Sequence, residues 1–223
     1  MTAPRTPSNW LRVRHRFAVV FLIVAPLQGL AWSLLVPIFR GSMEIEVADI
    51  AAHHAAFVAG TYLGVLMSFA MIPAALAWGR LLRPAAPVGS DVASVLCALG
   101  ACFHGGVLVF QMAESSLVAG IPDRAAAVGA VNHLFDTSAF MLVLMPFWAF
   151  YIGLAALAVI LALRKVGPRW IAAAVIIAII IELASPIPFK ARVFFAVLVP
   201  CFAAVARIVW KLGPEEWAAR GSA

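Results

Sequence analysis

The chain has 223 residues, of which 65% are hydrophobic and only 12% are charged, and its mean hydropathy is +1.03. A soluble domain has about 45–50% apolar and about 25% charged residues, and a chain of this length has too little interior to bury the excess, which excludes a soluble globular fold. The net charge of +6 does not indicate nucleic-acid binding, because the basic residues form short clusters beside apolar segments instead of a continuous stripe.

Six apolar segments follow one another along the chain, each within the range of about 17–27 residues expected of a membrane-spanning helix. They cover residues 17–38, 54–78, 91–113, 137–163, 170–186 and 193–210. The first follows a basic cluster, as a signal peptide does, but it is too long and no A-x-A cleavage site follows, so we predict an uncleaved span. Residues 122–136 begin with Pro-Asp and predict a short surface or partly inserted helix that continues into the fourth span.

These segments predict an all-α integral membrane helical bundle with about six transmembrane helices. The bundle would cover residues 17–212, between an N-terminal tail (1–16) and a C-terminal tail (213–223). Twelve of the sixteen Lys and Arg residues fall on the side of the two tails. Because positively charged loops remain in the cytoplasm, we expect both tails to be cytoplasmic (N-in, C-in) in a multi-pass protein of the cell membrane.

Polar side chains recur at helical spacing in the outer halves of five spans. They are Gln28 and Trp32 in the first span, His54 and Thr61 in the second, His104, Gln111 and Glu114 in the third, Asn132, Asp136 and Phe140 at the head of the fourth, and Glu182 in the fifth. A polar group that faces lipid costs several kcal/mol. We therefore expect these stripes to face one another around a pocket that opens outward.

Glu182 is the strongest candidate for a functional group, because it follows a purely aliphatic stretch and no basic residue comes before Lys190. Two alternatives stay open elsewhere: His104 as a core histidine bonded across helices, and Asp136 as an interfacial residue. The acidic residues between the first two spans (44–49) are expected in a solvated loop, and Asp123 as a helix N-cap.

Motifs of several membrane enzymes are missing from the sequence. It contains no C-x-x-C, no G-x-S-x-G and no aspartate-rich diphosphate motif, and no His or carboxylate pair has the local spacing of a metal site. We therefore expect neither a metal nor a cofactor.

The C-terminal half carries one resemblance. A span that ends in ALRKVGPRW, an aliphatic span, and a last span with a central proline and W-K-L are similar to a broad family of small bacterial multi-span membrane proteins of unknown function. This resemblance implies a multi-span fold in a bacterial plasma membrane. It does not imply an activity.

A looser resemblance concerns the whole bundle. Small helical bundles with outer-half carboxylates and many aromatics resemble the integral-membrane terpene cyclases of fungal meroterpenoid and actinobacterial pathways, which are usually drawn with seven spans. The resemblance implies carboxylate acids acting on polyprenyl substrates. It makes Glu182, Asp136 and Glu114 the candidate acids, and Trp32, Phe103, Phe140 and Trp148 the candidate cavity walls.

The favoured interpretation is an enzyme that uses carboxylate general acid catalysis on a lipophilic, isoprenoid-type substrate entering from the bilayer. The candidate substrate-binding residues are His104, Gln111, Asn132, Gln28, Trp32 and Phe140. One alternative is a small transporter or proton-coupled carrier. Another is an accessory subunit whose membrane-protein partner packs on small-residue faces such as Gly60 with Gly64 and Gly100 with Gly105. No nucleic-acid partner is expected.

Overall fold

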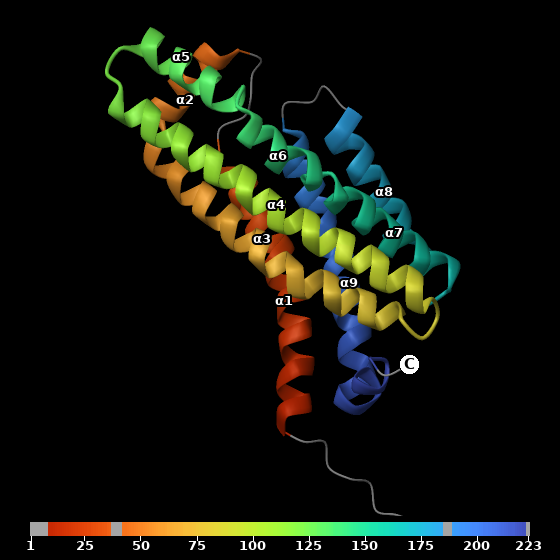
Figure 1. Ribbon diagram of the computed structural model, residues 1–223. Helices are drawn as coiled ribbons and strands as arrows, with labels where there is room; N and C mark the ends of the chain where they lie inside the picture. The colour runs from red at the N-terminus through yellow and green to blue at the C-terminus, as the bar shows by residue number, and fades with distance from the viewer. Residues whose placement is uncertain (1–8, 37–41, 185–188, 222–223) are drawn as a thin grey trace, which may run out of the picture.

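A computed structural model describes residues 9–36, 42–184 and 189–221, and this part of the chain contains nine helices and no strand (Figure 1). The helices are α1 (Asn9–Leu35), α2 (Met43–Ala52), α3 (His54–Leu82), α4 (Pro87–Gly120), α5 (Arg124–Phe135), α6 (Ser138–Phe147), α7 (Ala149–Leu163), α8 (Arg169–Ala184) and α9 (Lys190–Ala219). The predicted all-α bundle is confirmed.

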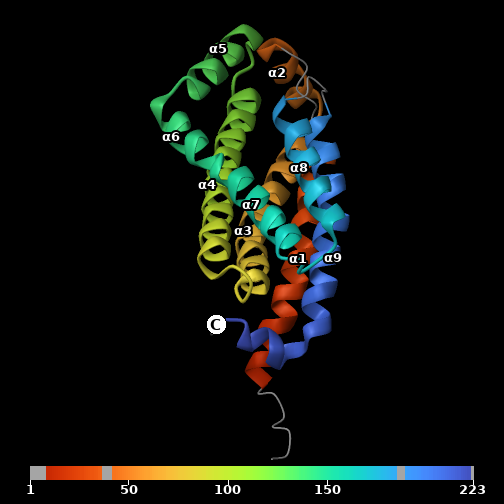
Figure 2. The same ribbon diagram turned by 90° about the vertical axis from the view of Figure 1, so that its right-hand side faces the viewer.

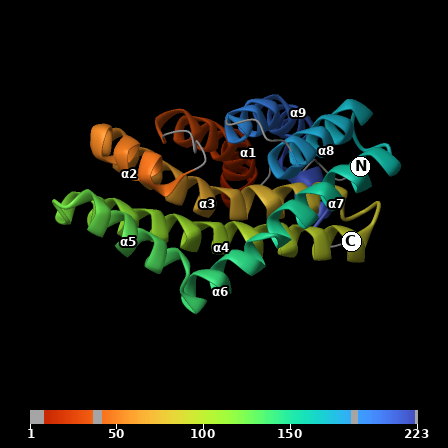
Figure 3. The same cartoon turned by 90° about the horizontal axis from the view of Figure 1, so that it is seen from above.

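Six of these helices form a closed ring of neighbours. In order around the ring, α1 packs on α3, α3 on α4, α4 on α7, α7 on α8, α8 on α9, and α9 again on α1. Figure 3 shows the ring from above, with α3 and α4 on one side and α1, α8 and α9 on the other. Because the first and last helices are neighbours, the bundle has an enclosed middle.

Five helical segments of the described chain are long and apolar enough to cross a membrane: α1, α3, α4, the α6–α7 pair and α9. The sixteen residues of α8 span only about 24 Å at 1.5 Å per residue, less than the hydrocarbon core of about 30 Å. The two described chain ends lie at the same end of the bundle (Figure 2), where an even number of crossings would place them. The sixth predicted crossing, which α8 would make, stays a prediction.

The outside of the bundle is covered with large apolar side chains. Phe17, Phe69 and Leu142 are 56%, 61% and 72% exposed, and many others resemble them. In water, so much contiguous apolar surface would drive aggregation. Together with the long apolar helices, it indicates a multi-pass membrane protein whose outer surface contacts lipid.

Helices extend into both segments that the sequence assigns to the tails. Helix α1 begins at Asn9, so residues 9–16 belong to a helix, while residues 1–8 lie outside the described part. Helix α9 breaks at Gly213, where φ is +74°, and the chain then turns back on the bundle. There Arg80 donates to the carbonyls of Trp217 and Ala218, at 3.1 and 2.6 Å.

Two short helices, α2 and α5, cover the end of the bundle opposite the chain ends (Figure 1). The expectation of a solvated loop over residues 44–49 is wrong, because Ser42 caps α2 and the apolar side chains of that helix pack inward. The predicted N-cap role of Asp123 is confirmed by its side chain, which accepts from the Ala125 N–H at 3.0 Å. The predicted continuity of residues 122–136 with the next span is also wrong, because Thr137 starts a separate helix, α6.

Glycines allow the closest helix crossings. A Cβ atom on Gly100 of α4 would lie 2.5 Å from Cα of Phe150 in α7, and one on Gly153 would lie 2.6 Å from the Ala93 carbonyl. Gly60, Gly64 and Gly105 also face residues of the same bundle. The small-residue faces that suggested a membrane-protein partner are therefore used within the chain and give no support to such a partner.

Candidate functional site

A cavity of about 190 Å³ lies inside the ring and is partly open to its surroundings. Side chains from α1, α3, α4, α6, α7, α8 and α9 line it, so every helix of the ring contributes to its wall. Most of the wall is apolar or aromatic, and a few polar groups interrupt it. This combination is typical of a small-molecule site in a helical bundle.

Four of the residues singled out from the sequence meet at this cavity: Trp32, His104, Gln111 and Glu182. They come from α1, α4 and α8, which are distant in the chain. The expected convergence of polar stripes therefore occurs for three helices.

Other predicted site residues lie elsewhere. Asn132 and Asp136 are exposed, on α5 and at its C-terminal end. The ring of Phe140 packs against Phe110 and Phe135, with ring centroids 5.2 and 4.9 Å apart. These three residues, predicted at the start of the fourth span, therefore do not reach the cavity, because α5 turns away from α6.

The remaining residues of the prediction are also outside the cavity wall. Gln28 precedes Trp32 by one helical turn, and its buried Oε1 has no hydrogen-bond partner in the described chain. In the polar stripe of α3, Thr61 has its hydrogen-bond partner within the same helix, because its hydroxyl donates to the Phe57 carbonyl at 2.9 Å. Phe103 and Trp148, expected as cavity walls, do not line it, whereas the neighbouring Phe147 does.

His104 is held in one orientation by Ser68 of α3. Ser68 Oγ lies 3.0 Å from the Gly64 carbonyl and 2.8 Å from His104 Nδ1. A carbonyl can only accept, so the single hydroxyl proton of Ser68 goes to Gly64, and Nδ1 of His104 must donate its proton to Oγ. In the neutral ring this leaves the lone pair on Nε2, which therefore can act as a base.

Three buried polar atoms of the cavity wall have no protein partner among the described residues. They are Trp32 Nε1, Gln111 Oε1 and Glu182 Oε2. Leaving such an atom unpaired costs about 1–3 kcal/mol. The hydrogen-bonding groups of a bound molecule would remove this cost, so the three atoms make the cavity a candidate binding site.

Aromatic rings surround the polar groups. His104 has the Trp32 ring edge-on at 5.6 Å and the Phe147 ring at 5.0 Å, and Tyr151 packs on Phe147 at 5.2 Å. Glu182 and Tyr151 both line the cavity. Sequence reasoning missed Ser68, Phe147, Tyr151, Phe194 and Phe195, because nothing in a single sequence separates cavity-facing aromatics from lipid-facing ones.

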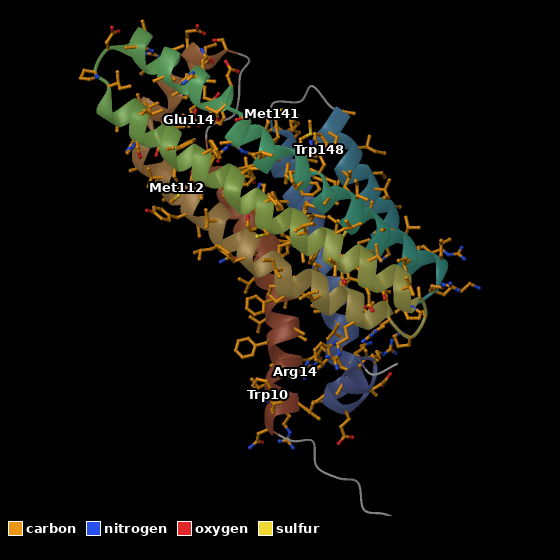
Figure 4. The ribbon with its side chains drawn as sticks, viewed as in Figure 1. Trp10, Arg14, Met112, Glu114, Met141 and Trp148 are labelled. Atoms are coloured by element: carbon orange, nitrogen blue, oxygen red, sulfur yellow. The ribbon has the colours of Figure 1, made fainter. Side chains whose placement is uncertain are left out.

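Glu114 belongs to a second buried feature, nearer the end of the bundle that α2 and α5 cover. Figure 4 shows it on the part of α4 closest to α2 and α5. Its side chain is fully buried, neither carboxyl oxygen has a hydrogen-bond partner in the described chain, and it interacts with the carboxyl group of Glu46 in α2. Burial raises the pKa of Glu46 to about 7.

The surroundings of this carboxyl pair hold few polar partners. His54 Nε2 donates to the Ser115 carbonyl at 3.3 Å, and Arg124 donates to the Glu44 carbonyl at 3.1 Å. Within the described residues, no group of three or more His, Cys, Asp or Glu side chains is arranged to hold a metal ion. The pair is best satisfied when at least one of its two carboxyl groups is protonated.

Models of known protein families, curated proteins and solved structures were compared with this chain, and none of the three comparisons gives a match.

Proposed function

We propose that the protein is a membrane enzyme that acts on a lipophilic, isoprenoid-type substrate and uses Glu182 as a general acid. The observation that carries this proposal is the half-buried carboxyl group of Glu182, whose Oε2 atom is buried without a hydrogen-bond partner in the described chain, in an aromatic cavity that also contains an oriented histidine. A buried carboxyl group in apolar surroundings favours its protonated form, which is the form that donates a proton.

The cavity offers each group that an acid-initiated rearrangement needs. Protonated Glu182 adds its proton to a carbon–carbon double bond, whose electron pair forms the new C–H bond and leaves a cationic carbon. The faces of Trp32 and Phe147 stabilise that cation, and a second double bond of the substrate closes a ring by attacking it.

Removal of a proton ends the reaction. Nε2 of His104 takes a proton from a carbon next to the cation, the C–H electrons restore a double bond, and the proton returns to Glu182. The product is an isomer of the substrate, so the reaction consumes no oxidant, reductant or cofactor.

The size of the cavity limits what it encloses. An engineered cavity of about 150 Å³ accommodates benzene, so about 190 Å³ suffices for the reacting end of an isoprenoid and not for a long polyprenyl chain. Because the cavity is partly open, the rest of such a chain would extend out of the bundle, where lipid surrounds it.

The test is to incubate purified protein in lipid nanodiscs with geraniol, farnesol and geranylgeraniol, and to look for isomers of unchanged mass by gas chromatography and mass spectrometry. We expect isomer formation by the wild-type protein and a loss of about 10²–10⁴-fold in Glu182→Gln, the range of general acid catalysis. Glu44→Gln is the matched control, because it makes the same chemical change at an exposed carboxylate.

Two further variants sharpen the result. His104→Gln should also lose activity, whereas Asp136→Asn should retain it, because Asp136 is exposed and outside the cavity. Full activity in Glu182→Gln, or no product from any of the three alcohols, would contradict the proposal.

A second candidate, a proton-coupled carrier, is favoured by the buried pair of Glu46 and Glu114. Two neighbouring buried carboxyl groups that share a proton can bind and release it as a carrier changes conformation. In proteoliposomes with an imposed pH gradient, a carrier would show solute uptake that Glu114→Gln abolishes and Glu44→Gln preserves. If solute uptake did not respond to the pH gradient in either variant, the enzyme would be the better interpretation.

A further inference from the structure

A groove of about 300 Å³ runs between α1 and α3 at the end of the bundle that carries both chain ends. Phe17 and Phe21 of α1 form one wall, Pro73 and Leu76 of α3 form the other, and Trp217 of the C-terminal turn closes one end. Phe17 and Leu76 are exposed, so the groove is open toward the surroundings of the bundle. It is separate from the central cavity, with which it shares no lining residue.

The polarity of the groove changes along its length. Helices α1 and α3 run in opposite directions, so Arg14 near the start of α1 and Arg80 near the end of α3 lie at the same end of the groove. Figure 4 shows Arg14 on the lower part of α1, close to Trp10. Phe21 and Pro73 come seven residues further into the bundle, which corresponds to about 10 Å. The groove therefore has two guanidinium groups at one end and an apolar channel behind them.

The positive charge of this end is not neutralised by the described chain. Arg80 donates to two carbonyls, and its Cζ lies 4.2 Å from the centroid of the Trp217 ring, so it is fixed in position without an anionic partner. Arg14 is exposed and forms no ion pair with a described residue. Arg14 and Arg83 are both close enough to repel Arg80.

Two carboxylates near this end form ion pairs with other arginines, and Glu215, which forms none with a described residue, lies outside the groove lining. Asp91 pairs with Arg83 at 3.3 Å, and Glu216 pairs with Arg220 at 3.2 Å. No acidic side chain of the described residues lines the groove. An occupant of this groove should therefore carry both a negative charge and an apolar chain, in that order along the bundle axis.

We propose that the groove binds an anionic phospholipid, with its phosphate between Arg14 and Arg80 and one acyl chain along Phe17 and Phe21. Basic pockets between transmembrane helices on the cytoplasmic side bind anionic lipid headgroups, and this end of the bundle is the one that the distribution of Lys and Arg predicts to be cytoplasmic. Trp10, which also lines the groove and is exposed, has the amphipathic ring that favours the headgroup region.

The test is native mass spectrometry of the full-length protein released from micelles that contain equal amounts of phosphatidylglycerol and phosphatidylcholine. We expect phosphatidylglycerol to be retained preferentially, and Arg14→Gln to weaken its retention about fivefold, the effect of one basic side chain near an anionic membrane surface. Arg12→Gln and Arg16→Gln are matched controls, because both residues are exposed on the same helix and lie outside the groove.

A second pair of variants tests the apolar part. Val13→Trp fills the groove without changing its charge and should reduce lipid retention, whereas Val20→Trp adds the same ring to an exposed site outside it and should not. Equal retention of the two lipids by the wild-type protein would overturn the proposal. So would an equal loss in Arg14→Gln and Arg12→Gln, unchanged retention in Val13→Trp, or displacement of the lipid by millimolar inorganic phosphate.

Discussion

Replacing Gly100 by alanine would place a methyl group against the backbone of α7. The new Cβ would lie 2.5 Å from Cα of Phe150, whereas carbon atoms in contact are separated by about 3.5–4.0 Å. The obstacle is backbone inside a helix, so no side-chain rotation relieves it. Helices α4 and α7 would have to separate locally by about 1 Å.

The energetic cost follows from two opposing effects. Overpacking costs about 1–3 kcal/mol, and the immovable backbone places this site at the upper end of that range. Alanine returns up to about 1 kcal/mol through its higher helix propensity. We therefore expect Gly100→Ala to lower the free energy of unfolding by about 2 kcal/mol. The displacement should also reach the cavity, because Phe150 and Tyr151 form part of its wall.

The measurement is reversible unfolding in mixed micelles with increasing dodecyl sulfate, followed by circular dichroism. Gly129→Ala in α5 is the matched control: no heavy atom lies within 4 Å of its added Cβ, so it should be neutral or stabilise by up to about 1 kcal/mol. If Gly100→Ala unfolds at the wild-type midpoint, or if Gly129→Ala is equally destabilised, the close approach of α4 and α7 is refuted.

Two further predictions concern the ends of the bundle. Because burial raises the pKa of Glu46 from 4.5 to about 7, docking of α2 is strongest below about pH 4.5 and weakens as the pH rises through 7, by at most about 3 kcal/mol. The hydrogen-exchange protection factors of α2, which compare the observed rate with the intrinsic rate at each pH, should therefore fall between pH 5 and 8 in the wild-type protein but not in Glu46→Gln; constant protection factors in the wild type would contradict this. At the other end, Arg80→Gln should free the C-terminal turn and speed proteolysis after Gly213, and Arg80→Lys should not restore protection, because a lysine cannot bond two carbonyls and stack on Trp217 at once. Unchanged cleavage in both variants would show that the turn is held by other contacts.

The long helices and part of the cavity could be predicted from the sequence alone. Apolar runs indicate where membrane helices lie, and each of the six predicted segments overlaps a helix or the α6–α7 pair of the described chain, although α1, α4 and α9 extend further than predicted. His104 and Gln111 are seven residues apart, which places them on one face of α4, and both line the cavity. Glu182 stands out because a carboxyl group in an aliphatic helix needs a protein or aqueous environment.

The remaining features depend on tertiary contacts, which produce no periodic pattern in the sequence. Ser68 orients His104, yet the two residues are 36 positions apart on different helices. Glu46 looks like a loop residue because it lies in a short acidic stretch, and only the packing of α2 on the bundle buries it. Asp136 looks like part of a continuous helix, but the side chain of Thr137 starts α6 and leaves Asp136 at the exposed corner between two helices.

The closed ring of helices has a consequence for how the protein is made. A ribosome releases α1 first and α9 last, and the contact between these two helices completes the ring. Until α9 has left the translocation machinery, Trp32 lacks its neighbour Phe195, and the polar groups on α4 and α8 have no finished enclosure. The cavity therefore forms only after α9 has been made. A truncation before residue 190 should yield a protein without this cavity, whose exposed polar side chains membrane quality control can recognise.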